Sequence, residues 1–125
     1  MEYADNMLSK LFGKKQDMGK VFIIPFHVKP LDNSIMPANL EAAYVSCYAK
    51  GETYVEATQN SLAKLSVDGL YPEEILQPIH EMQVSEWANH INEQWRDQIA
   101  NLPSQKEFEN SILSGNVVYG PFGSY

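Results

Sequence analysis

Three residues of the chain have side chains that could hold a metal ion or act as a nucleophile: His27, Cys47 and His80. Imidazole nitrogen and thiolate sulfur are zinc ligands, and a thiol beside an imidazole can form a cysteine nucleophile. Each of the three lies on a different predicted strand, so neighbouring strands could bring them together. None has a ligand partner at the short spacing of typical metal sites, which favours ordinary packing roles for all three.

Catalytic signatures are absent from the sequence. It contains no nucleophile elbow, no P-loop, no G-x-G-x-x-G after a strand, no H-E-x-x-H and no C-x-x-C. We therefore assign no catalytic residue, metal ligand or cofactor, and we favour a non-enzymatic function. A small enzyme or metal-binding protein that uses His27, Cys47 and His80 stays as the alternative.

The acidic residues are a second chemical feature. The formal net charge is −7, and Arg96 is the only Lys or Arg between residues 73 and 97. This balance opposes nucleic-acid binding, because phosphate contacts need clustered Lys and Arg, but it favours encounter with a basic protein. We predict that one negative surface binds a protein partner through Glu73, Glu74, Glu86, Glu93 and Asp97.

Hydrophobic patterning predicts the strands that position these residues. Residues 21–28 and 40–48 are apolar, aromatic and β-branched, residues 79–84 alternate, and residues 117–119 add a short fourth segment. Pro25 has no N–H to donate, so the first strand is expected at a sheet edge or to be bulged there. The prediction is an α+β fold with a small antiparallel or mixed sheet of three to four strands, and with helices packed on one face and at one end.

Capping residues and apolar stripes predict the helices. Thr53 and Glu56 begin a T-x-x-E capping box, so a helix over 53–66 should start there, and Gly69 follows its last turn. Pro72 before two acids favours a single helical turn. Ser85 is expected to cap a helix to about residue 101. The expected core residues of the first helix are Val55, Leu62 and Leu65, and those of the second are Ala88, Ile91, Trp95, Ile99 and Leu102.

The C-terminal part has a second capping box, formed by Ser104 and Glu107, before a short helix that should bury Phe108 and Ile112. The whole chain, 1–125, is expected to be one domain. Residues 1–20 form an amphipathic segment within it, and residues 85–113 form the C-terminal helices. A single cysteine suits the reducing cytoplasm, and no apolar run approaches the roughly 20 residues that span a bilayer.

The segment from Cys47 to Ala57, continued by Leu62, Leu65 and Gly69, resembles the strand–turn–helix segment of HicB-like antitoxins, over about residues 40–69. The resemblance implies a partial ribonuclease H-like sheet with helices on one face. That family usually has three strands before the helix, where this sequence predicts two, and its DNA-binding tail is not evident here. The sequence thus favours an acidic protein-interaction domain of the antitoxin or immunity-protein kind. A homo-oligomeric structural or regulatory domain, such as a homodimer, is the alternative among binding functions.

Overall fold

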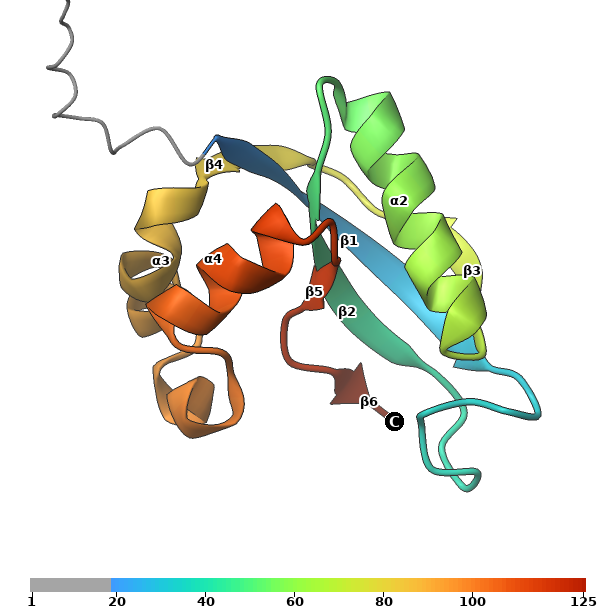
Figure 1. Cartoon of the computed structure of the whole chain (residues 1–125). Coiled ribbons are helices and arrows are strands. Elements are labelled where there is room, and N and C mark those ends of the chain that lie inside the picture. The colour runs from blue at the N-terminus through green and yellow to red at the C-terminus, as the bar shows by residue number, and fades with distance from the viewer. Residues whose placement is uncertain (1–18) are drawn as a thin grey trace, which may run out of the picture.

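The computed structural model describes residues 19–125, and the amphipathic segment expected over residues 1–20 lies outside them except for its last two residues. Figure 1 shows a single sheet with helices on either side. The elements in chain order are β1 (Lys20–Pro30), β2 (Ala43–Lys50), α2 (Tyr54–Val67), β3 (Leu70–Ile75), β4 (His80–Gln83), η2 (Val84–Glu86), α3 (Trp87–Gln94), η3 (Arg96–Asn101), α4 (Gln105–Leu113), β5 (Val118–Tyr119) and β6 (Gly123–Ser124).

The sheet is antiparallel and confirms the predicted α+β class. Its order is β3-β1-β2-β5, with β4 also paired to β1 and β6 also paired to β2. The six strands include two that the sequence did not predict, β3 and β6. The helical turn expected at Pro72 is wrong, because Leu70–Ile75 pairs with the C-terminal half of the long strand β1. A proline is tolerated in β3 because β3 is an edge strand.

Pro25 predicted that β1 lies at a sheet edge or is bulged at that residue, and the edge position is wrong. β1 is central, and one of its sides is covered by two separate strands: β4 pairs with Lys20–Ile23 and β3 with Phe26–Pro30. Pro25 lies at the gap between them, where its carbonyl accepts a hydrogen bond from the Leu76 N–H at 2.8 Å. The N–H that proline lacks would therefore have pointed at the gap between β3 and β4, where no strand needs it. The pairing of β1 with β3 shifts its register between His27 and Val28.

The first core lies between the sheet and α2. Alternate residues of β1 point to this face, among them Phe22, Ile24 and Phe26, and all are buried. α2 packs on them through Ala57, Ser61 and Leu65, which are four residues apart and therefore share one side of the helix. Leu62 is only half-buried, and the expected burial of Val55 is wrong, since it is 51% exposed.

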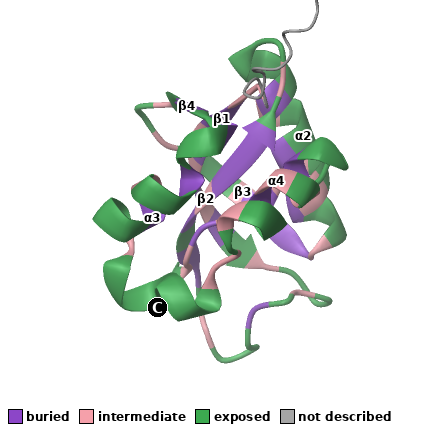
Figure 2. Cartoon of the chain, turned by 60° about the vertical axis from the view of Figure 1, so that its left-hand side comes forward, coloured by how far each residue is buried: buried purple, intermediate pink, exposed green. Residues whose placement is uncertain are grey.

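The second core lies at one end of the other face, under α3 and α4. Figure 2 shows the buried strands between helices whose outer sides are exposed. The ring of Phe108 stacks on Trp87 with centroids 4.1 Å apart, and the edge of Tyr48 meets Trp87 at 5.0 Å. The residues of this core are Val21, Tyr48, Met82, Val84, Trp87, Ile91, Phe108, Ile112 and Val118.

The single helix expected over 85–101 is wrong. A 3-10 turn, α3 and a second 3-10 turn replace it, and the backbone leaves the helical region at Trp95, with φ −133 and ψ 36. The indole of Trp95 donates to the Tyr48 hydroxyl of the sheet, so a tertiary contact accompanies the break. Ala88 and Ile99 are exposed rather than part of the core, and Ser85 caps nothing.

Both predicted capping boxes mark true helix starts. The Glu107 N–H donates to Ser104 Oγ, and Glu107 Oε1 accepts from the Ser104 N–H at 2.8 Å. The Glu56 N–H likewise donates to Thr53 Oγ1, but Glu56 reaches one residue further back, to the Glu52 N–H at 2.7 Å. In the part of the chain from 19 onward, no helix is long and apolar enough to cross a membrane.

Candidate functional site

The three residues that could have formed a metal or nucleophile site do not come together, and the sheet separates Cys47 from both histidines. Cys47 pairs with Ile24, so it lies on the face that α2 covers. His80 pairs with Ile23 and therefore lies on the opposite face, and so does His27. His27 is four residues from Ile23 along β1, which is about 13 Å. Among the described residues, no group of three His, Cys, Asp or Glu is placed to hold a metal ion.

The environment of Cys47 opposes nucleophilic use. Its side chain is fully buried, and burial raises the pKa of the thiol to about 12, an effect that a hydrogen bond with Ser61 only partly offsets. The thiolate is the reactive form of cysteine, and it is not formed near neutral pH here. Cys47 therefore serves as a small core residue between β2 and α2.

His27 belongs to an aromatic stack at the uncovered end of the second sheet face. Its ring stacks on Tyr44 with centroids 4.7 Å apart, and its Nε2 is 2.8 Å from the Tyr125 hydroxyl. Tyr44 is 50% exposed and Tyr125 is 53% exposed. The stack links the C-terminal end of the chain to β1 and β2.

A groove on the same sheet face, beside α3, is the strongest candidate for a binding site. It has a volume of about 600 Å³ and lies between β4, the middle of β2 and the outer side of α3. Its acidic residues are Glu81 on β4, Glu86 on η2 and Glu93 on α3, and no Lys or Arg lines it. The Glu81 carboxylate is paired with Lys20 at 3.2 Å. Tyr48, His80, His90 and Trp95 also line it.

A hydrogen-bond network forms the floor of this groove. The Tyr48 hydroxyl is 2.7 Å from His90 Nε2 and accepts from the Trp95 indole N–H at 3.3 Å. Burial raises the pKa of Tyr48, so the hydroxyl keeps its proton. Burial also lowers the pKa of His90, against the opposite effect of the Glu93 charge, so the imidazole is neutral at pH 7. The Tyr48 O–H can then donate to a free Nε2 lone pair.

Stability is expected to fall in mild acid because of His90. A histidine whose pKa is lower in the folded state than in the unfolded state contributes stability that is complete above its ordinary value of 6.5. This contribution declines as the pH falls below that value, because the unfolded chain binds the proton more readily. Urea unfolding at pH 7.5, 6.5 and 5.5 should therefore show a steeper loss for the wild type than for His90→Gln.

His90→Gln is the matched variant because its side chain can still accept a hydrogen bond but does not titrate. His27→Gln serves as the control, since its ring stands in the distant stack. The expectation is wrong if the wild type and His90→Gln lose stability in parallel over this pH range.

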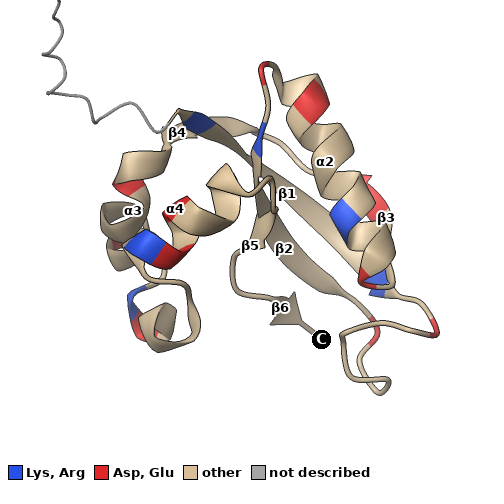
Figure 3. Ribbon diagram, viewed as in Figure 1, with Lys and Arg blue, Asp and Glu red and all other residues tan. Residues whose placement is uncertain are grey.

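The five acids predicted to form one surface fall into two groups. Glu86 and Glu93 line the groove, and Asp97 follows on η3. Glu73 and Glu74 lie on β3, on the other side of the molecule from α3 in Figure 3. Glu73 also has a cation within reach, since Lys29 Nζ is 3.6 Å from its carboxylate. All five side chains are exposed.

Three of the residues singled out from the sequence, His80, Glu86 and Glu93, line this groove, but the sequence does not predict the groove or its floor. Its patterns indicate only a strand for Tyr48 and an apolar helical stripe for Trp95, and they give no role to His90. Their only sequence signal is that each side chain has both an aromatic ring and a polar atom, which favours partly polar sites.

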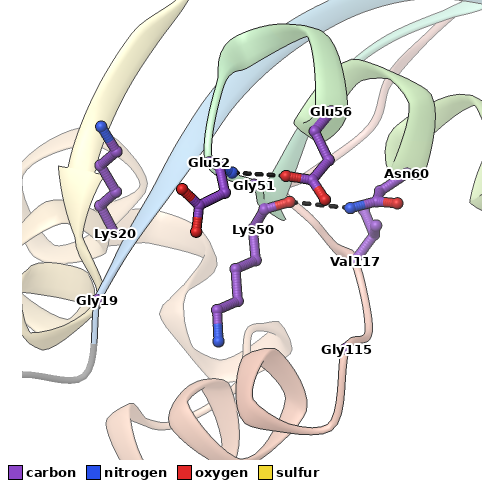
Figure 4. Close-up of a pocket in the computed structure, with 9 residues that line it drawn as sticks. All are labelled: Gly19, Lys20, Lys50, Gly51, Glu52, Glu56, Asn60, Gly115 and Val117. Atoms are coloured by element: carbon purple, nitrogen blue, oxygen red, sulfur yellow. Dashed lines mark hydrogen bonds between the residues drawn. The ribbon is translucent and has the colours of Figure 1, made fainter.

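A second cavity, of about 510 Å³, lies where β1 and β2 meet the start of α2 (Figure 4). Lys20 and Lys50 line it together with Glu52 and Glu56, so it has no excess of either charge. Glu56 accepts the Glu52 N–H, and the Asn60 amide donates to the Lys50 carbonyl at 2.9 Å. These contacts stabilise the turn into α2.

Comparison of the chain with protein-family models, with curated proteins and with solved structures finds no match. The resemblance to HicB-like antitoxins therefore stays a prediction, and only the geometry of the site itself bears on function.

Proposed function

We propose that this chain is a non-enzymatic protein-interaction domain, of the small acidic antitoxin or immunity-protein kind. It binds a partner with a basic surface through η2, α3 and η3. The observation that carries the proposal is a run of exposed carboxylates beside a groove that no Lys or Arg lines. Glu86, Glu93 and Asp97 form no ion pair with another described residue.

The two acidic groups differ in how well they suit this role. A carboxylate that lacks a nearby cation keeps its full charge for an incoming partner, whereas Glu73 already faces Lys29. Glu86 and Glu93 line the same groove, and Asp97 follows on the next element, η3, so we expect the three charges to act together on an approaching partner. Glu73 and Glu74 are kept as a secondary contact surface.

Replacing the three acids by Glu86→Gln, Glu93→Gln and Asp97→Asn is expected to slow association with the partner about tenfold at low salt. The melting temperature should hardly change, because exposed charges contribute little to stability. The partner is first identified by capture from native lysate and mass spectrometry. Association rates of the purified pair are then measured from low to high salt.

The matched control is Asp32→Asn, Glu41→Gln and Glu52→Gln, which removes the same charge from exposed positions elsewhere. It should slow association far less, and a separate Glu73→Gln, Glu74→Gln variant tests the β3 surface. Equal effects of the two triple variants, or rates that do not change with salt, would contradict a local acidic binding surface.

A further inference from the structure

The groove beside α3 combines two features that bind the same chemical group. Its floor has aromatic rings: Tyr48 is buried, while Trp95 is only half-buried and lines the opening. Its outer wall has two carboxylates, Glu86 and Glu93. Glu86 ends η2 and Glu93 lies on α3, and both line the groove together with His90, which lies between them in the sequence.

We infer that this groove binds the guanidinium group of an arginine from the basic partner. The inference rests on the proposed function and names the group that this surface recognises. A cation is favoured because the lining has three acidic residues and no Lys or Arg, and two of the three, Glu86 and Glu93, form no ion pair with another described residue. A phosphate or carboxylate ligand would meet only negative charge there, together with imidazoles, of which His90 is neutral at pH 7.

Arginine fits the groove better than lysine for geometric reasons. A guanidinium is planar and less strongly hydrated than an ammonium group, so it stacks on an indole ring while its edge donates to carboxylates. The Trp95 indole lines the groove and is fixed in position, because its N–H donates to the Tyr48 hydroxyl at 3.3 Å. That hydroxyl is held in turn by His90, 2.7 Å away. The floor is therefore organised before a ligand arrives.

The volume of the groove is sufficient for one side chain. About 600 Å³ of open groove accommodates an arginine side chain and the backbone on each side of it. Glu86 and Glu93 would thus act twice: their charges attract the basic partner toward α3, and their carboxylates flank the place where its arginine binds.

The test uses the full chain and small probes, so it does not need the partner. Nα-acetyl-arginine-N-methylamide is titrated at constant ionic strength, and NMR follows the Trp95 indole N–H and the backbone amides of α3. The matched probes are the citrulline analogue, which is neutral and of the same shape, and the lysine analogue. The arginine probe should shift these signals saturably and bind about tenfold more tightly than citrulline.

Glu86→Gln with Glu93→Gln should weaken arginine binding about fivefold to tenfold, while Asp32→Asn with Glu41→Gln should leave it unchanged. Trp95→Leu should abolish it, with the circular dichroism spectrum used to check the fold. Equal shifts from arginine and citrulline, shifts confined to residues outside the groove, or equal binding of lysine would overturn the inference. The proposed function would survive that result if the partner still needs the three acids. If arginine binds but the partner does not need them, the proposed function fails instead.

Discussion

Phe108→Ala is expected to lower the free energy of unfolding by about 3–5 kcal/mol. Phe108 is fully buried, stacks on Trp87 with an interplanar angle of 2°, and meets the edge of Tyr48 at 6.2 Å. Alanine would lose these contacts and leave a cavity directly behind the floor of the groove. Urea unfolding followed by Trp fluorescence measures the loss.

Leu113→Ala is the matched control in the same helix. Leu113 is 58% exposed, so removing its side chain should change the free energy of unfolding by less than about 1 kcal/mol. Comparable losses from the two variants would mean that α4 does not pack on the sheet through Phe108.

Phe108→Ala also tests whether the two cores unfold together. Trp87 and Trp95, the only tryptophans of the chain, lie in or against the second core, so fluorescence reports on that core. Circular dichroism also includes α2 over the first core. In a single domain the two transitions of Phe108→Ala coincide. Separate transitions, or ready proteolysis between residues 69 and 85 into two folded pieces, would contradict the predicted single domain.

Gly69→Ala is expected to cost about 2–5 kcal/mol. Gly69 has φ +71, which an L side chain rarely adopts, and an added Cβ would lie 2.7 Å from backbone atoms of Asn33 and Ser34. Those residues belong to the loop after β1, which is bonded to this turn: the Leu31 N–H donates to the Gly69 carbonyl at 2.8 Å. The loop would have to move away from the end of α2.

Gly115→Ala separates the two causes of that loss. Its φ is +84, but an added Cβ would meet nothing within 4 Å, so only the backbone strain of about 1–2 kcal/mol applies. Chemical denaturation of both variants gives the comparison. If both cost the same, the loop does not pack against Gly69 as the structure describes.

The groove connects these stability predictions to function. Its floor depends on the second core, because Tyr48 takes part in both. A variant that loosens α3 and α4 should therefore weaken partner binding even when it leaves every carboxylate in place. Any binding measurement on a variant of this core must consequently be made under conditions where the protein is folded.

The sequence by itself determined the features that depend on neighbours three or four residues apart. The capping boxes at Thr53 and Ser104 predicted true helix starts. The capping side chain and the backbone N–H that it accepts from are only three residues apart, so their contact does not depend on the rest of the chain. Continuous apolar and β-branched runs predicted β1 and β2, and alternation predicted β4, because these patterns also depend only on residues close in the sequence.

Only the tertiary structure decided pairing, register and the site. Leu70–Ile75 became a strand because β1 is long enough to pair with it, and the helix after β4 broke where Trp95 reaches Tyr48. Cys47 lies apart from both histidines because side chains alternate between the faces of a sheet, so the parity of the register assigns each residue to a side. The groove is made by residues as far apart as Ile23 and Trp95, and their proximity results from folding rather than from any local pattern.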